Sequence, residues 1–170
     1  QHLELAGGIA EITFDCGAKI MLEGPAALDA ESAWQATLLR GALKAVVPSQ
    51  AIGFRVHHAS VEVVDLGTEF SMVADAAGEA DVRVLKGSIE VAPTNGEDAA
   101  PTGMKERESR RFGKVRKNER RDFDDLHTRL AKATALDRWN QRTSYAHWSF
   151  NDVSGGVFKA EVSGLTGTRE

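Results

Sequence analysis

Hydrophobic and polar residues alternate through the first half of the chain. Apolar side chains occupy every second position in the run from Ile9 to Phe14 and in several later runs, the last of which ends near Pro93. A period of two places alternate side chains on opposite faces of a β-strand. Glycines separate the runs at intervals typical of turns. The pattern therefore predicts an all-β region of short strands over residues 1–93.

Three stretches of this region resemble one another. They read LAGGIAEITF, LRGALKAVVP and LKGSIEVAP, each with a leucine, a nearby glycine and then alternating apolar positions. Their spacing along the chain is not constant, which disfavours a strict repeat array. The repetition instead favours short strands wound back on themselves in a twisted sandwich or a β-solenoid-like stack.

Residues 27–39 are ambiguous. Their sequence, ALDAESAWQATLL, is rich in alanine, which indicates a helix. Alternate positions in the same segment also fit two strands joined by a turn. Both interpretations remain open from the sequence.

The composition changes after Pro93. The stretch PTNGEDAAPTG is typical of an exposed loop, and Lys105 to Arg142 hold about 13 Lys and Arg residues against about 7 Asp and Glu. The mixed charges and scarce apolar residues predict a solvated, charged loop or linker over residues 94–121.

A helix is predicted over residues 122–142. Acidic residues crowd its start, arginines lie near its end, and Leu126, Leu130 and Ala133 fall on one face. The alternating stretch SYAHWSFND then predicts a trailing strand, in which His147 contributes to a sheet face. We expect the last 20 or so residues either to be disordered or to pack on the β domain or on a neighbouring chain.

Composition excludes several classes of protein. The net charge of -4 argues against nucleic acid as the main partner. The single cysteine, Cys16, excludes an intrachain disulfide and every multi-cysteine metal site. No apolar run approaches the roughly 20 residues of a membrane helix, so no membrane insertion is expected within these residues.

Two acidic residues in the stretch DLGTEF are candidates for chemistry. Asp65 and Glu69 are four positions apart, which would place both carboxylates on one face of a helix. Gly67 and the flanking valines instead indicate a strand and a turn, where no such pairing follows. We expect Gly67 to adopt a backbone conformation closed to other residues, while Asp65 or Thr68 satisfies local amide groups.

The histidines give no metal site. His57 and His58 follow Arg55 in an alternating run, so their side chains face opposite sides of a strand, and no third ligand is evident. We interpret them as an ordinary exposed pair. Because nucleotide-binding, hydrolase and zinc-protease motifs are also missing from the sequence, no catalytic residues, cofactor or metal are predicted.

Several segments, in order, resemble the periplasmic sensor domain of the FecR family. They are GGIAEITFDCGAKIMLEGPAAL, ATLLRGALKAVVPSQAIGFRV, VEVVDLGTEFSMV and VRVLKGSIEV, and they span Leu5 to Val91. The most specific part is the structural signature formed by Asp65, Leu66, Gly67, Thr68, Glu69 and Phe70. The sequence departs from the family at residues 57–59, where a Thr-Pro pair is frequent, and at Ser71, where glycine is frequent.

The resemblance is greatest to planctomycete and verrucomicrobial versions, in which a lectin-like domain follows. YAHWSFNDVSGG resembles the opening strand of a laminin-G-like, concanavalin-like domain. The resemblance thus implies a FecR-like β domain over residues 1–93 and the truncated start of a lectin-like domain over residues 143–170.

The resemblance implies a non-enzymatic sensor or interaction module. It would lie in the periplasm or at the cell surface, within a transmembrane signalling protein of the sigma-factor regulation type that is anchored by a segment outside this chain. Its expected partner is a protein of the envelope, such as an outer-membrane receptor or a secretion component. The alternative is a glycan-binding or cell-wall-associated adhesion module.

Overall fold

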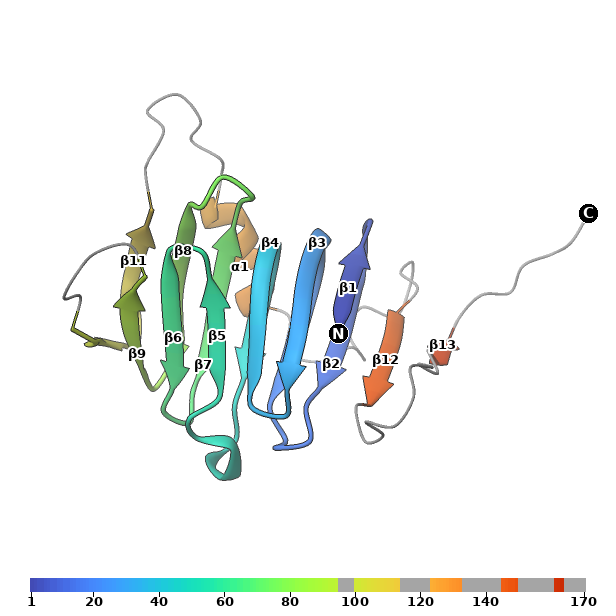
Figure 1. The fold of residues 1–170 in the computed structure, drawn as a ribbon, viewed down its shortest axis with the longest axis horizontal. Coiled ribbons are helices and arrows are strands. Elements are labelled where there is room, and N and C mark those ends of the chain that lie inside the picture. The colour runs from blue at the N-terminus through green and yellow to red at the C-terminus, as the bar shows by residue number, and fades with distance from the viewer. Residues whose placement is uncertain (95–99, 114–122, 133–144, 150–160, 164–170) are drawn as a thin grey trace, which may run out of the picture.

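A computed structural model describes residues 1–94, 100–113, 123–132, 145–149 and 161–163 (Figure 1). The prediction of an all-β fold with a C-terminal helix and a trailing strand is confirmed. The elements are β1 (His2–Leu5), β2 (Ile9–Thr13), β3 (Lys19–Ser32), β4 (Gln35–Val46), the 3-10 turn η1 (Ser49–Ala51), β5 (Arg55–His58), β6 (Val61–Asp65), β7 (Glu69–Ala74), β8 (Ala80–Lys86), β9 (Ser88–Pro93), β10 (Thr102–Lys105), β11 (Ser109–Phe112), α1 (Phe123–Lys132), β12 (Tyr145–Ser149) and β13 (Glu161–Ser163).

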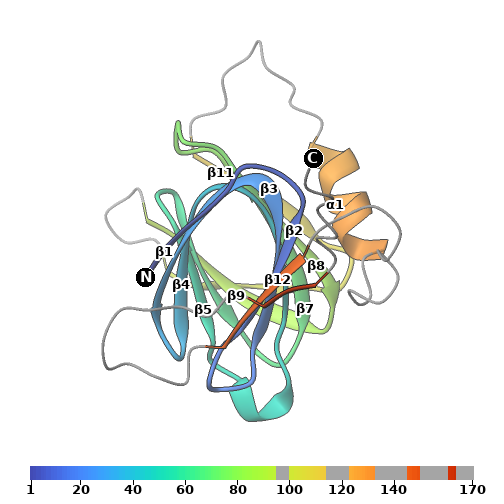
Figure 2. The same cartoon turned by 90° about the vertical axis from the view of Figure 1, so that its right-hand side faces the viewer.

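The long hairpin of β3 and β4 belongs to both layers of a sandwich. The half of the hairpin next to its turn pairs with β1 on one side and, in parallel, with β5 on the other. Strands β6, β9 and β10 extend this first layer. The half far from the turn pairs with β2 and β7. Strands β8, β11, β12 and β13 extend this second layer. Figure 2 shows the two layers curving around a common core, with α1 outside the ring.

At the bend of the hairpin, glycines allow two close approaches, one between β3 and β4 and one between β3 and the turn after β1. Gly41 has φ +107°, and a Cβ atom placed on it would lie 2.4 Å from the Cβ of Ala26. A Cβ atom on Gly24 would lie 2.7 Å from the Cα of Gly7. Only glycine fits such approaches, so glycine is required at the place where β3 and β4 pass from one layer to the other.

The core lies between the layers and is formed by the inward side chains of both. Phe54 and Phe70 are fully buried in it, and the rings of Phe14 and Phe54 meet edge to face with centroids 4.8 Å apart. Because inward positions alternate with outward ones, each layer also has an outer face whose residues are free to carry function.

Residues 27–39 form the tip of the β3–β4 hairpin, so the helix interpretation of this segment is wrong and the two-strand interpretation is correct. Leu28, Ala36 and Leu38 are buried in the core at every second position. That period of two outweighs the helix propensity of the alanines because burial of a sheet face contributes more than intrinsic preference.

Part of the predicted linker over residues 94–121 is strand. β10 pairs with β9, and β11 pairs with β8. Met104 and Phe112 are buried in the core and hold these strands on the sandwich despite the charged residues around them. The two apolar anchors were too sparse to show a period of two. The division of the chain into domains stays a prediction.

The helix α1 covers only Phe123–Lys132 of the predicted 122–142, and the rest of that range lies outside the described residues. Its Leu126 and Leu130 pack on the second layer, on the side away from the core. No helix among the described residues has the length and apolar character needed to cross a bilayer.

The trailing strand packs on the β domain. β12 pairs in parallel with β2 in a register that runs from His147 opposite Glu11 to Ser149 opposite Thr13. The expectation for the last 20 or so residues falls mostly outside the described residues and stays a prediction. The interpretation of residues 143–170 as the start of a lectin-like domain stays a prediction.

Candidate functional site

The DLGTEF stretch connects the two layers. Asp65 is the last residue of β6 in the first layer, and Glu69 is the first residue of β7 in the second layer. Leu66 is 41% exposed at the tip of the turn, and Thr68 is buried beneath it. The stretch is a crossover between layers at one end of the sandwich.

The carboxylate of Asp65 organises this turn. Its Oδ1 accepts hydrogen bonds from the backbone amides of Gly67 at 2.6 Å and Thr68 at 2.9 Å, and its Oδ2 accepts one from the Thr68 hydroxyl. Asp65 is fully buried. A buried carboxylate with this set of donors is engaged with its own backbone and has no access to a substrate.

Gly67 has φ +91°, the conformation expected from its place in the turn. A Cβ atom on it would also lie 3.2 Å from the Cγ1 of Ile52, an exposed residue of the neighbouring loop. Gly87, in the turn between β8 and β9, has φ +84°, and a Cβ atom there would lie 2.6 Å from the Cγ2 of Thr68. Two adjacent turns therefore require glycine for their mutual fit.

Glu69 and Phe70 point to opposite sides of β7. Phe70 is fully buried in the core, whereas the Oε2 of Glu69 lies 3.1 Å from the Nζ of Lys44 on the outer face of the second layer. Asp65 is buried on the inner side. The two carboxylates of the stretch do not face each other and so do not form an acid–base pair.

His57 and His58 lie on opposite faces of β5, but the prediction of an exposed pair is wrong, because His57 is half-buried and His58 is buried. His58 is 4% exposed, its Nδ1 accepts a hydrogen bond from the backbone amide of Ser60 at 3.3 Å, and its Nε2 lies 3.2 Å from the carbonyl oxygen of Asp75. These partners fit the neutral ring with its hydrogen on Nε2. Burial lowers the pKa of His58, against the opposing hydrogen bond and charge of Asp75.

The outer face of the first layer carries a row of polar side chains across neighbouring strands. In register, His2 lies opposite Asp29, Asp29 opposite Thr37, Thr37 opposite His57, and His57 opposite Glu62. Inward neighbours such as Leu3, Leu28 and Val56 pack on the core, so the row faces outward.

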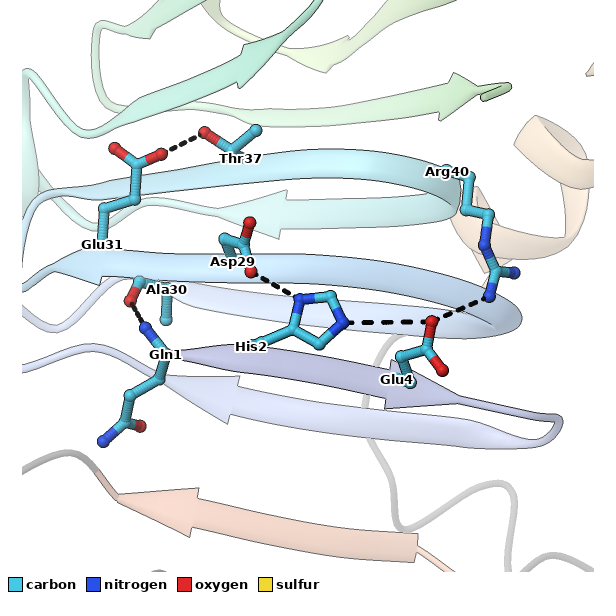
Figure 3. A network of polar contacts seen from close by, with 8 residues as sticks. All are labelled: Gln1, His2, Glu4, Asp29, Ala30, Glu31, Thr37 and Arg40. Carbon is cyan, nitrogen blue, oxygen red and sulfur yellow. Dashed lines mark hydrogen bonds and ion pairs between the residues drawn. The ribbon is translucent and has the colours of Figure 1, made fainter. Parts of the chain in front are cut away.

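Ion pairs order one end of this face (Figure 3). The Nδ1 of His2 lies 2.7 Å from the Oδ1 of Asp29, and Arg40 Nη2 lies 3.3 Å from Glu4 Oε1. Farther along, the Nη1 of Arg55 lies 3.1 Å from the Oε1 of Glu62. No helix covers this face among the residues that the structure describes, so the paired charges lie at the surface.

The outer face of the second layer is covered by α1 and holds a buried polar contact. His127 of α1 is fully buried, with its Nδ1 2.7 Å from the Ser71 hydroxyl oxygen and its Nε2 3.1 Å from the Oδ1 of Asp81. Arg111 Nε lies 3.1 Å from the Oδ2 of Asp81. Burial alone would raise the pKa of Asp81, but the hydrogen bond and charge of His127, together with those of Arg111, outweigh it and lower the pKa.

Ser71, His127 and Asp81 have the residue types of a hydrolytic triad but not its access. Ser71 and His127 are both fully buried beneath α1, so no substrate carbonyl can reach the Ser71 hydroxyl while the helix is docked. In addition, Ser71 faces Nδ1 and Asp81 faces Nε2, the reverse of the usual triad. The arrangement is that of a structural contact.

Sequence reasoning did not find this contact. Ser71 and Asp81 lie on neighbouring strands and His127 on a distant helix, so no spacing along the chain connects them. The only available signal was the alternation that places Ser71 and Asp81 on the outer faces of their strands. In the described part of the chain, no group of three or more His, Cys, Asp or Glu residues is placed to hold a metal ion.

Comparison with solved structures found the same fold. Two crystal structures of a protein from Parabacteroides distasonis ATCC 8503, proposed to be an anti-sigma factor, match with TM-scores of 0.56 and 0.54 at 16% and 17% identity. Each match covers 65% of this chain and 54% of the solved chain, so the chain spans about half the length of these proteins. A search of curated proteins found no match.

A comparison with family models matched one described as FecR protein over residues 4–90, which is just over half of the chain. The match runs from within β1 to the middle of β9 and contains the DLGTEF crossover and the bent β3–β4 hairpin. The chain therefore belongs to the FecR protein family.

Proposed function

We propose that this chain is the sensor and interaction domain of a FecR-type signalling protein that regulates a sigma factor. It works in the periplasm or at the cell surface and is anchored by a segment outside this chain. Membership of the FecR family supports the signalling role. The shared fold with a protein proposed to be an anti-sigma factor supports regulation of a sigma factor.

The observation that carries the proposal is the difference between the two outer faces of the sandwich. α1 covers the second layer, where Ser71 and His127 are fully buried. The first layer presents surface ion pairs, such as Arg55 with Glu62, on strands held rigid by the core beneath them. A rigid, polar sheet face that no described helix covers suits recognition of another protein.

The proposal assigns no enzymatic activity to the domain. Asp65 is engaged with its own turn, Glu69 with Lys44, and Ser71 lies beneath a helix. Each candidate for acid–base or nucleophilic chemistry thus has a structural partner, and Asp65 and Ser71 are fully buried, which supports a role in binding.

The partner we propose is a protein of the envelope, such as an outer-membrane receptor or a secretion component. It docks on the outer face of the first layer, where the row from His2 to Glu62 supplies directional polar contacts. Paired charges of this kind contribute more to the choice of partner and to the rate of association than to affinity. The glycan-binding alternative depends on residues 143–170, and no observation on the described strands favours it.

Site-specific photocrosslinking in the source bacterium tests the docking face. A photoreactive residue at Arg55, 53% exposed on the first layer, is compared with one at Arg107, 91% exposed in the turn between β10 and β11. We expect an adduct with one defined envelope protein from Arg55 and none from Arg107. Equal adducts from both positions, or none from Arg55, would refute this face.

Transcript profiling tests the signalling role. Deletion of the gene is expected to change expression from one group of sigma-factor-dependent promoters, and Glu62→Lys in the full-length protein should reproduce much of that change. Glu106→Lys, an exposed charge reversal in the turn between β10 and β11, is the matched control and should behave as wild type. A deletion that alters no such promoter group would rule out sigma-factor regulation.

A further inference from the structure

Helix α1 docks on the sandwich through a small apolar contact of its own. Leu130 and Leu126 pack against Ala42 of β4 and Val73 of β7 on the outer face of the second layer. This cluster is separate from the main core, which lies on the other side of the same strands. Loss of the helix would therefore leave the packing between the two layers in place.

The centre of the α1 interface is polar. His127 is fully buried and meets Ser71 at 2.7 Å and Asp81 at 3.1 Å. A buried hydrogen bond replaces bonds to water and contributes little net stability, whereas an apolar side chain in the same place would hold the helix more firmly. The contact therefore determines the position of α1 on the sheet but adds little to the free energy of docking.

The ion pairs of Arg129 lie at the edge of the α1 interface. Arg129 lies 2.8 Å from Glu23 of β3 and 2.6 Å from Asp125 of its own helix, and its side chain is 47% exposed. Exposed ion pairs of this kind contribute weakly because solvent screens them. A helix of 10 residues is also marginal when it is not docked. Docking and helix formation in α1 are thus coupled and weakly favoured.

We propose that α1 is a releasable latch, which undocks from the second layer while the sandwich stays folded and uncovers the strip formed by Ala42, Ser71, Val73 and Asp81. The helix follows the FecR match of residues 4–90, so its release would change how the sandwich connects to the chain after it. The latch requires neither the partner nor the sigma factor of the proposed function, and it is tested on the isolated chain.

Hydrogen exchange measured by NMR at constant pH tests the latch. Amides of α1 are expected to exchange at least about 100-fold faster than core amides such as those of Leu43 and Val82, because α1 opens without global unfolding. His127→Ala and the milder Ser71→Ala should each raise α1 exchange a further 5- to 10-fold or so and leave core exchange unchanged. His57→Ala, the same change on the opposite outer face, should leave α1 exchange unchanged.

A disulfide trap gives an independent reading. Ala42→Cys with Leu130→Cys, in a Cys16→Ser background, should form a bond on oxidation and slow α1 exchange toward the rate of the core. Reduction should restore the fast exchange. The latch is overturned if α1 and core amides exchange at one common rate, if His127→Ala and Ser71→Ala leave α1 exchange unchanged, or if oxidation has no effect on it.

Discussion

The Nε2 of His58 lies 3.2 Å from the backbone carbonyl oxygen of Asp75, and this contact ties the turn after β5 in the first layer to the turn after β7 in the second. The side chain of Asp75 in turn accepts hydrogen bonds from the amides of Ala77 and Glu79, both at 2.9 Å. The DLGTEF crossover joins the layers at the start of β7, and His58 joins them beyond its end. At each end of β7, a buried polar side chain thus connects the two layers through a turn: Asp65 at its start and His58 beyond its end.

Stability should decrease as the pH falls below about 6.5, the ordinary pKa of histidine, because of His58. Burial lowers its pKa in the folded state, so the unfolded chain binds more protons in this range and acid favours unfolding. Denaturant titrations from pH 8 to pH 5 should show a steeper loss for wild type than for His58→Gln. His2→Gln, at an exposed histidine, should follow wild type. Parallel curves for wild type and His58→Gln would contradict this role.

Gly67→Val should destabilise the fold by about 1 to 3 kcal/mol, because valine is strained at φ +91°. Contact with the side chain of Ile52 adds to this cost. Gly103→Val in β10 is the control, since Gly103 has no positive φ and open space around its Cβ position. Chemical denaturation gives the unfolding midpoint of both variants. An unchanged midpoint for Gly67→Val would show that the turn does not require glycine.

Gly41→Ala should cost about 2 to 6 kcal/mol, the sum of backbone strain at φ +107° and overpacking against Ala26 at the bend of the hairpin. Gly53→Ala separates the two causes, because Gly53 has φ +95° but no atom within 4 Å of the added Cβ. Thermal melts should therefore give Gly41→Ala a clearly lower melting temperature than Gly53→Ala. Equal losses would mean that close approach at the bend contributes nothing.

Glu69→Gln should destabilise the protein by about 1 to 2 kcal/mol, because it removes the negative charge that lies 3.1 Å from the buried ammonium group of Lys44. Partial exposure of Glu69 limits the loss through solvent screening. The control is Glu62→Gln, which breaks a surface pair with Arg55 and should cost about 0 to 1 kcal/mol. Urea titrations that give the two variants the same midpoint would show that burial of Lys44 does not matter.

Local chemistry was readable from the sequence wherever a residue acts on its own neighbours. Gly67 was expected to adopt a backbone closed to other residues, with Asp65 serving nearby amides, and the structure has φ +91° and those hydrogen bonds. The alternating residues predicted an all-β fold, with a twisted sandwich or a β-solenoid-like stack both open, for the same reason, since the period of two is set within each strand.

Two expectations failed where distant residues decide the environment. His58 was expected to be exposed, but it is buried because the turn after β7 folds over it. Residues 102–112 were expected to lie in a linker, but Met104 and Phe112 find places in a core built by strands far from them in sequence. Neither position has a local signal of its burial.

The sequence by itself determined the alternating strands before Pro93, the DLGTEF turn and the FecR resemblance, because periodicity, turn chemistry and motif spacing are properties of neighbouring residues. The tertiary structure alone decided that β3 and β4 pass through both layers, that α1 packs on the outer face opposite to the polar row, and that Ser71, Asp81 and His127 meet. These features depend on contacts between residues far apart in the chain, and which of those contacts form is settled only when the shared core excludes water.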